Sequence, residues 1–429
     1  MTPVIKRRVE QLRHGEVPEG YKRTKAGVVP AEWEEVRIGD VLTQRKTLMC
    51  ISDDAPLLSF TIEEGVIDPA DKKSNKRDFL IKDMATKKFA LTEVGDIIYN
   101  PANLKFGAIH RNNLRRGVVS PIYGIFYGEQ DSVFMGYLLH NQRFIDYAKI
   151  YTEGTVEKLK TLKADTFLKL KITLPSLNEQ KRIVEILTAQ DKLIELQTEK
   201  IKQLKILKKG FLQILFPKKG CTHPELRFKG FLDAWEQHKL GSAGNTYTGL
   251  SGKTKEDFGH GDGRFITYMN VFANPISSLH GVEPVEIDNS QNEVQIGDVF
   301  FTTSSETPEE VGMSSVLLEK QGKTYLNSFC FGYRPSTYFD PYYLAYMLRS
   351  DNVRKQIVFL AQGISRYNIS KNKMMEINIP IPSAEEQQQI GTCFKDLDNL
   401  ITFHQYKLDQ EKQKKKALMQ LLLTGIVRV

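Results

Sequence analysis

Two segments of the chain carry apolar residues at the spacing of one helix face. In residues 179–216, and again in residues 386–423, apolar side chains recur three and four positions apart over about five heptads. A Pro-Ser pair precedes each run, carboxylates lie in its first turn, and Pro217 and Gly425 follow the runs. The pattern predicts two long amphipathic helices. Because a large segment between them must return the chain, we expect the helices to pair as an antiparallel coiled coil.

The segments before the two helices have a different texture. Short apolar runs typical of β-strands, such as Ile97–Tyr99 and Val299–Phe301, alternate with loops rich in glycine, asparagine, aspartate and lysine. Each segment also holds one stretch with helical spacing, near Met135–Tyr147 and near Pro341–Phe359. We therefore predict an α/β (mixed α+β) fold with two globular domains, each followed by a long helix. The predicted divisions are an N-terminal segment at 1–19, a first domain at 20–176, a helix at 177–217, a second domain at 218–383 and a second helix at 384–425.

The two halves of the chain are copies of one another. Residues 175–216 align without a gap to residues 382–423, and roughly a third of the aligned positions are identical. The two tryptophans of the chain, Trp33 and Trp235, also fall at equivalent places. Gly95-Asp96 and Gly297-Asp298 form a further matching pair at the start of a predicted strand. The repeat is thus a duplication of a whole domain and its helix, and not a solenoid.

Charge and cysteine usage narrow the class of protein. The net charge of +8 fits a polyanionic partner. No apolar run reaches the ~18 residues of a membrane helix, and residues 1–16 lack the apolar core of a signal peptide. The four cysteines, Cys50, Cys221, Cys330 and Cys393, form no CxxC pair. We expect a cytoplasmic protein with neither a disulfide framework nor a zinc site.

Three short motifs look like parts of catalytic or metal sites, and each lacks a required residue. Residues 99–103 are similar to the Asn-Pro-Pro-aromatic motif of adenine methyltransferases, but no aromatic residue stands there to stack a flipped base. Residues 252–254 would need a glycine where Tyr247 stands to form a phosphate-binding P-loop. Cys221 and His223 have no second pair of metal ligands. The sequence therefore predicts that this chain is not a catalyst, and that it binds no metal or other cofactor.

Further motifs recur at the start of both domains and of both helices. The two sets are Gly20-Tyr21-Lys22-Arg23-Thr24, Val29-Pro30, Trp33 and Ile38-Gly39-Asp40, and then Pro224-Glu225-Leu226-Arg227-Phe228, Gly230-Phe231, Trp235 and Lys239-Leu240-Gly241. Together with the Gly-Asp strands and the Glu-Gln pairs that open the helices, they resemble the specificity (S) subunit of type I restriction-modification systems. The resemblance covers nearly the whole chain. It departs at Ser242-Ala243, where an acidic residue would follow the glycine.

The resemblance implies a function in DNA recognition. Each globular domain would be a target recognition domain that reads one half of a bipartite, asymmetric site in double-stranded DNA. The helices would set the spacing and dock two modification (methyltransferase) subunits, and two restriction (motor and nuclease) subunits would complete the complex. S-adenosylmethionine, ATP and Mg²⁺ are then expected on the partner subunits. Two other interpretations of the residues stay open: a fragment of a fused restriction-methyltransferase enzyme, and a structural coiled-coil adaptor.

Reading a DNA sequence requires side chains that bond to base edges, supported by phosphate contacts. Loops after the Gly-Asp strands, and after Gly154 and Gly363, mix both kinds and differ between the halves, as expected for readers of different half-sites. Two interpretations stay open for the lysines toward the ends of the long helices. They form a solvent-exposed helix face, or they contact DNA or a partner subunit. The candidate DNA-binding residues are Lys72, Lys73, Asn75, Arg77, Asn100, Asn103, Lys105, Thr155, Lys158 and Lys160 in the first half, and Lys253, Lys255, Thr303, Ser304, Ser305, Arg366, Tyr367 and Asn368 in the second.

Overall fold

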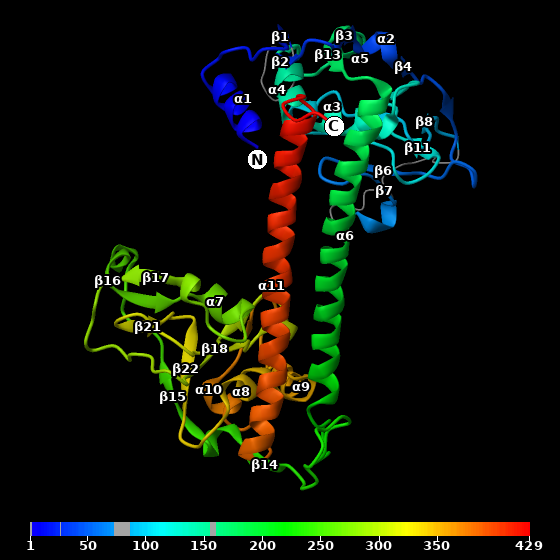
Figure 1. Cartoon of the computed structure of the whole chain (residues 1–429). Coiled ribbons are helices and arrows are strands. Elements are labelled where there is room, and N and C mark those ends of the chain that lie inside the picture. The colour runs from blue at the N-terminus through cyan, green and yellow to red at the C-terminus, as the bar shows by residue number, and fades with distance from the viewer. Residues whose placement is uncertain (1, 26, 73–85, 155–159) are drawn as a thin grey trace. The chain divides into compact units, whose positions relative to one another are not determined.

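The chain forms two compact units, each of which holds one globular half and part of both long helices (Figure 1). The computed structural model describes residues 2–25, 27–72, 86–154 and 160–429. The first unit comprises Met1–Leu196 and Leu408–Val429, and the second comprises Gln197–Lys407. The predicted mixed α/β fold with two long helices is confirmed.

The first unit is built on a four-stranded antiparallel sheet in the order β10-β9-β12-β4, accompanied by a three-stranded sheet in the order β11-β8-β5. The elements before the first long helix are α1 (Pro3–Arg13), β1 (Tyr21–Thr24), β2 (Gly27–Pro30), β3 (Glu34–Arg37), α2 (Ile38–Val41), β4 (Thr43–Gln44), β5 (Leu48–Met49), β6 (Ser59–Thr61), β7 (Gly65–Ile67), β8 (Phe89–Thr92), β9 (Ile97–Tyr99), β10 (Ile109–Arg111), β11 (Gly117–Val119), β12 (Gly124–Tyr127), α3 (Ser132–His140), α4 (Gln142–Lys149), α5 (Ala164–Lys169) and β13 (Lys171–Leu174).

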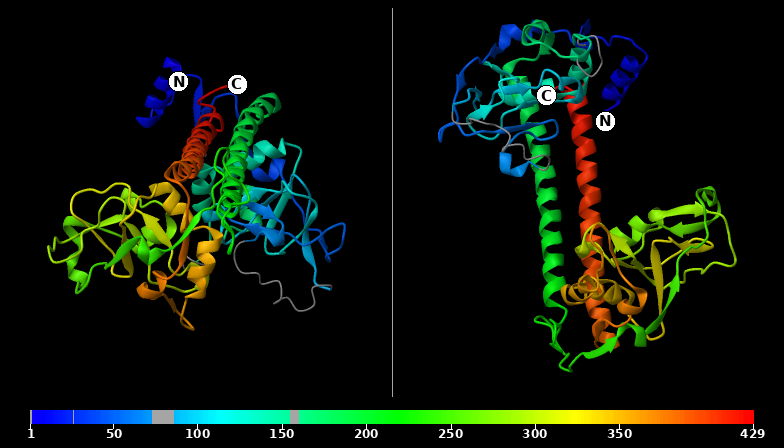
Figure 2. Two further views of the ribbon diagram at one scale, coloured as in Figure 1. Left: turned by 90° about the horizontal axis from the view of Figure 1, so that it is seen from below. Right: turned by 180° about the vertical axis from the view of Figure 1, so that it is seen from behind.

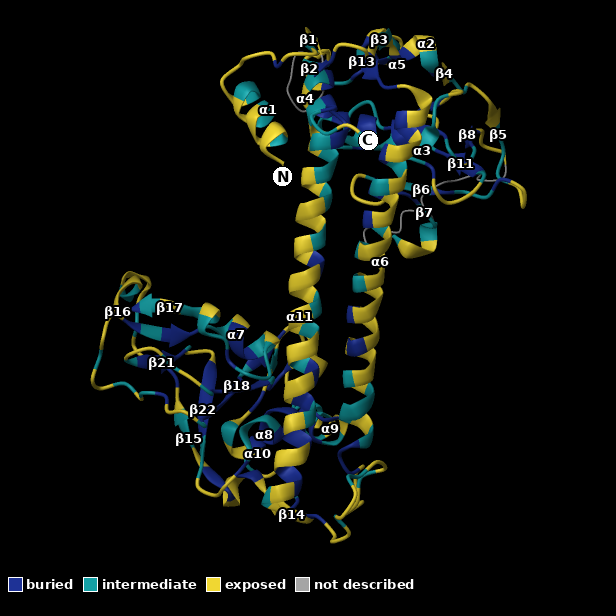
Figure 3. Cartoon of the chain, in the orientation of Figure 1, coloured by how far each residue is buried: buried dark blue, intermediate teal, exposed yellow. Residues whose placement is uncertain are grey.

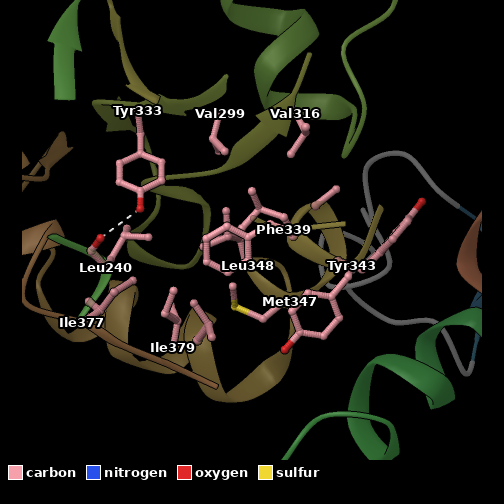
Figure 4. Close-up of a cluster of buried hydrophobic side chains, with 14 of the residues drawn as sticks. Leu240, Val299, Val316, Tyr333, Phe339, Tyr343, Met347, Leu348, Ile377 and Ile379 are labelled. Atoms are coloured by element: carbon pink, nitrogen blue, oxygen red, sulfur yellow. Dashed lines mark hydrogen bonds between the residues drawn. The ribbon is translucent and has the colours of Figure 1, made fainter. Parts of the chain in front are cut away.

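The second unit repeats the four-stranded antiparallel sheet, in the order β15-β22-β18-β20. Its three-stranded sheet, in the order β17-β16-β21, differs from that of the first unit because β16 and β21 are parallel. Its core includes Tyr333, whose hydroxyl donates to the carbonyl of Leu240, and the buried Met347 beside Tyr343 (Figure 4). The elements are β14 (Glu236–Lys239), β15 (Gly244–Thr248), β16 (Phe258–Ile266), α7 (Tyr268–Ala273), β17 (Val282–Val285), β18 (Val299–Thr302), β19 (Ser304–Ser305), β20 (Ser314–Val316), β21 (Thr324–Leu326), β22 (Cys330–Pro335), α8 (Pro341–Met347), α9 (Asp351–Phe359), β23 (Tyr367–Asn368), α10 (Lys371–Met374) and β24 (Asn378–Ile381).

The repeated Gly-Asp motif has a structural cause. Asp96 is buried, accepts the backbone N–H of Glu93 and forms a two-bond ion pair with Arg45 at 2.7 and 2.9 Å. Asp298 is buried in the same way and pairs with Arg334 through two bonds of 2.8 Å, which raise the pKa of that guanidinium. Burying a carboxylate is costly unless it is paired and hydrogen-bonded, so these contacts fix the strand that each motif opens, β9 or β18.

Two predicted single helices are wrong, because each is a pair of helices. The stretch near Met135–Tyr147 is divided at Asn141, whose extended backbone ends α3 and whose side chain accepts the N–H of Arg143 to cap α4. The stretch near Pro341–Phe359 is divided before α9, where Ser350 is extended. Asn and Ser favour such cap positions, and periodicity alone does not reveal them.

The long helices are α6 (Leu177–Ile214) and α11 (Ala384–Leu422), and within each unit their segments lie side by side in opposite directions (Figures 1 and 2). In the first unit Gln190 donates to Glu411, and in the second Gln197 bonds to His404 at 2.7 Å. Much of each helix surface is exposed (Figure 3). Among the described helices, none is long and apolar enough to span a membrane.

A tryptophan–glutamate–arginine cluster closes each half. The indole N–H of Trp33 donates to Glu179 at 3.2 Å, and Arg428 forms two bonds with the same carboxylate. In the second half Trp235 donates to Glu386 at 3.1 Å, and Arg227 forms the two bonds. The arginine follows α11 in the first case and α6 in the second.

The closing clusters show how the halves are assembled. The tail after α11 completes the first globular half just as the segment after α6 completes the second. Because Glu179 and Glu386 lie in the first turns of their helices and are almost fully buried, they tie each helix start to its domain. This explains the glutamate of the Glu-Gln pair that opens both helices in the sequence.

Candidate nucleic-acid interface

In the second half, two loops far apart in sequence meet as a small antiparallel pair. Residues 304–305 form β19 and residues 367–368 form β23, with Ser304 opposite Asn368. The N–H of Ile369 donates to the carbonyl of Thr303 at 3.0 Å and extends the pairing. The structure thus brings together the predicted residues Thr303–Ser305 and Arg366–Asn368.

The side chains of this paired segment divide into supporting and exposed ones. Ser304 and Ser305 are buried, and the hydroxyl of Ser305 donates to Glu310 at 3.2 Å. Tyr367 is half-buried, whereas Arg366 and Asn368 are exposed. The amide of Asn368 makes one weak contact, to the carbonyl of Arg366 at 3.4 Å, so most of its hydrogen-bonding capacity is available to a ligand.

Among the described residues of the first half, the loop after β9 makes one contact that corresponds to the pairing in the second half. The loop after β9 contains Asn100 and Asn103, and the N–H of Leu162 donates to the carbonyl of Pro101 in that loop at 3.0 Å. The side chain of Asn100 accepts the N–H of Ala102 and so holds its own turn. Both asparagines are half-buried.

Basic residues at these loops have varied surroundings. The ammonium of Lys105 lies 5.2 Å from the ring of Phe106, and Lys72 and Lys160 are half-buried. Lys253 is paired with Asp288 at 3.1 Å, which raises the pKa of the lysine, and Lys255 is exposed before β16. Other predicted residues lie outside the described ones, namely Lys73, Asn75, Arg77, Thr155 and Lys158.

Exposed apolar residues beside the loops are a feature that the sequence reasoning missed. Phe106 follows Lys105 in the first half. In the second half the carbonyl of Phe329 accepts from Thr303, and Ile364 stands 97% exposed in the loop before β23. Residue type alone does not distinguish an exposed phenylalanine or isoleucine from a core one, so no signal in one sequence could have found them.

A groove of about 790 Å³ lies away from these loops. It lies in the second unit, between the end of α6 and α9, and Phe216, Lys355 and Ile377 are among its lining residues. It includes none of the candidate DNA-binding residues. In the same described ranges no group of three or more His, Cys, Asp or Glu side chains is arranged to hold a metal ion.

Comparison with known proteins identifies the family. Residues 30–206 and 233–412 both match the family described as the type I restriction modification DNA specificity domain. The chain belongs to this family. The prediction of a type I specificity subunit is therefore confirmed, and the two matched regions coincide with the two halves of the repeat.

Relatives along the whole length support this membership. The chain is 25% identical over 96% of its length to the type I restriction enzyme MjaVIII specificity subunit of Methanocaldococcus jannaschii, and covers 96% of that protein. It is 24% identical over 96% of its length to a putative MjaX specificity subunit of the same organism, and covers 97% of it. Specificity subunits are the non-catalytic DNA-recognition components of type I systems, and this chain is of the same class.

Solved structures share the fold at low sequence identity. One, from a study of complex assembly and conformational transition of the type I restriction-modification system, has a TM-score of 0.58 at 17% identity; the match covers 93% of this chain and 99% of that one. The type I S subunit of M. genitalium has a TM-score of 0.52 at 14% identity, over 91% of this chain and 96% of that chain. The specificity-subunit fold therefore extends over more than nine-tenths of the chain.

Proposed function

We propose that this chain is the DNA sequence-recognition subunit of a type I restriction-modification complex, and that each globular half reads one half of a bipartite site. One observation carries the proposal. Corresponding loops are hydrogen-bonded to each other in both halves, between Leu162 and Pro101 in the first and between Ile369 and Thr303 in the second, yet the loop sequences differ. A common frame with different loop tips suits two readers of different base sequences.

The proposal extends to the partners. Double-stranded DNA, two modification subunits and two restriction subunits are the expected partners, in the cytoplasm. The long helices dock the modification subunits and set the spacing between the half-sites. Support comes from the continuity of α6 and α11 and from their contacts with the globular half of each unit. S-adenosylmethionine, ATP and Mg²⁺ belong to the partner subunits.

The function is tested by reconstitution. The purified chain with labelled S-adenosylmethionine and DNA should transfer no methyl group, because recognition without a catalytic subunit yields no product. Adding the modification subunits should produce methylation at one bipartite motif, and the modification subunits without this chain should not. Methyl transfer by the chain alone would exclude the proposal. Methylation of the same motif by the modification subunits without this chain would exclude it as well.

We also propose roles for the exposed residues of the β23 loop. Asn368→Ala should cost ~1–3 kcal/mol of binding and relax one base position, since an amide that bonds a base edge discriminates between bases. Arg366→Ala should weaken binding to every sequence alike and lower the salt slope by about 1, as expected when one phosphate contact is lost. Both effects are measured by titrating the reconstituted complex with a panel of single-base variants at several salt concentrations.

Lys229→Ala provides the matched control for these variants, because Lys229 is an exposed cation outside both loops. It should leave the salt slope and the base preference of the second half-site unchanged. Equal, sequence-independent losses from Asn368→Ala and Arg366→Ala would mean that the bases are read elsewhere.

A further inference from the structure

A tyrosine, an aspartate and a lysine from three different elements meet in the first unit. The hydroxyl of Tyr137, on α3, donates to Asp191 of α6 at 2.5 Å. Lys415 of α11 pairs with the other oxygen of Asp191 at 2.5 Å, and its ammonium lies 5.3 Å from the centre of the Tyr137 ring. One helix of the globular half is thereby joined to both long helices.

The second unit contains the same cluster with the long helices exchanged. The hydroxyl of Tyr346, on α8, donates to Asp398 of α11. Lys208 of α6 pairs with the same aspartate, and its ammonium lies 4.7 Å from the Tyr346 ring centre. In both clusters the aspartate belongs to the helix that follows its own globular half, and the lysine comes from the other long helix.

The agreement between the clusters is reflected in the sequence. Asp191 aligns with Asp398, and Lys208 aligns with Lys415, in the repeat of the long helices. The same number of residues therefore separates aspartate from lysine on α6 and on α11. Each helix carries one aspartate for its own domain and one lysine for the other.

We propose that these two clusters are clamps that fix the orientation of each globular half on the pair of long helices, and that their six residues are positioning residues for the spacing between the two half-sites. The inference rests on the proposed function in DNA recognition. Chemically, each clamp joins three elements through one short hydrogen bond, one ion pair and one cation–π contact. A rotation of the globular half about the helices would break the tyrosine contacts.

The exposure and the pKa of the clamp residues suit a role in orienting the globular half better than a role in stabilising the fold. The side chains of the ion pairs are 20–37% exposed, and partly solvated pairs add little to the free energy of unfolding. Burial raises the pKa of both tyrosines, so that each stays a protonated donor. A cluster that contributes little to stability, yet recurs with the same geometry in both halves, is suited to fixing an angle.

The test measures how strongly methylation depends on the number of base pairs between the two half-sites. Tyr137→Phe and Lys415→Met alter the first clamp, and Tyr346→Phe and Lys208→Met alter the second. Each variant is assembled with the modification subunits, and methyl transfer is measured on duplexes whose two half-sites are separated by the natural gap or by one base pair more or less. We expect the preference for the natural gap to fall by about tenfold, the change that follows the loss of one charge-assisted contact. The preferred half-site sequences should not change.

Lys192→Met is the matched control. The ion pair of Lys192 with Glu195 lies on the exposed surface of α6 and involves no residue of the globular half. It should keep the gap preference of the unaltered chain. The phenylalanine variants remove a single hydroxyl each, so they decide the question even if a methionine variant fails to fold.

The outcomes separate the two proposals. If the unaltered complex methylates no specific motif, the proposed function fails. If it is specific and every clamp variant keeps the natural gap preference, or loses activity equally at all gaps, the clusters are merely structural and only the clamp proposal is overturned.

Discussion

Exchanging residues 20–175 for the corresponding domain of another type I specificity subunit should change one half of the methylated motif and leave the other half unaltered. The reason is that each unit has its own core, its own sheets and its own pair of meeting loops. Base contacts made by one set of loops need no residue of the other set. The result is read by sequencing the methylome of cells that express the exchanged chain.

The exchanged domain must preserve the contacts that hold the first globular half on the long helices. The donor domain must keep a tryptophan at the position of Trp33, because the buried carboxylate of Glu179 would otherwise lose the indole N–H that donates to it. It must also keep a tyrosine at the position of Tyr137, so that the first clamp is preserved. The reciprocal exchange of residues 218–383 is the control and should change only the other half-site. A change in both half-sites from one exchange would rule out independent reading.

The fold could be predicted from the sequence where one physical rule dominated. Apolar spacing sufficed for α6 and α11, because a helix of that length shows its period many times. Gly95-Asp96 and Gly297-Asp298 marked equivalent strands correctly, but their cause, the pairing with Arg45 and Arg334, depends on residues distant in the chain. No local pattern predicts such partners.

Helix ends were harder to predict than helix faces. The stretch around Asn141 has helical spacing on both sides, and only the side chain that caps α4 reveals the break. In a cap, a side-chain oxygen accepts a backbone N–H in place of a backbone carbonyl, so the apolar pattern continues across the break. At Ser350, before α9, the extended backbone alone marks the break, because that side chain makes no cap hydrogen bond.

The candidate DNA-binding residues stay predictions, but the structure shows how their loops are arranged. The loops at Thr303 and at Arg366 were chosen separately, and the structure joins them through β19 and β23. Ser304 and Ser305 turned out to be buried, and Ile364 turned out to be exposed, because exposure depends on the strands that pack around each loop. Sequence gives the chemistry of a side chain, whereas the fold decides whether that side chain faces solvent.

Lengthening both long helices by one turn should widen the unspecified gap between the half-sites by one or two base pairs. Four residues inserted into a helix add ~5.4 Å, and a base pair of DNA occupies ~3.4 Å. Four residues also turn the helix to within ~40° of its starting direction, so the apolar stripe stays nearly in line. The insertions are placed after Glu199 in α6 and after Gln405 in α11.

Both helices must be lengthened together. Gln197 and His404 are in contact at 2.7 Å, so α6 and α11 are paired next to the insertion points. An insertion in α6 alone would shift its apolar residues past those of α11, and we expect that variant to lose stability and activity. A four-residue insertion after Gly220 is the second control. Gly220 is exposed, and a side chain placed there would meet no other atom within 4 Å, so the gap should stay as it is.

The methylome of cells with the doubly lengthened chain checks the expected gap. Each added base pair turns the duplex by about 34°, since half-sites one DNA turn apart are separated by 10–10.5 base pairs. The duplex must therefore untwist, or the globular halves must turn against their clamps, and affinity should fall somewhat while both half-site sequences are kept. Combining the insertion with Tyr137→Phe should recover part of that affinity, because a loosened clamp permits the turn. An unchanged gap with full activity would show that the helices do not set the spacing.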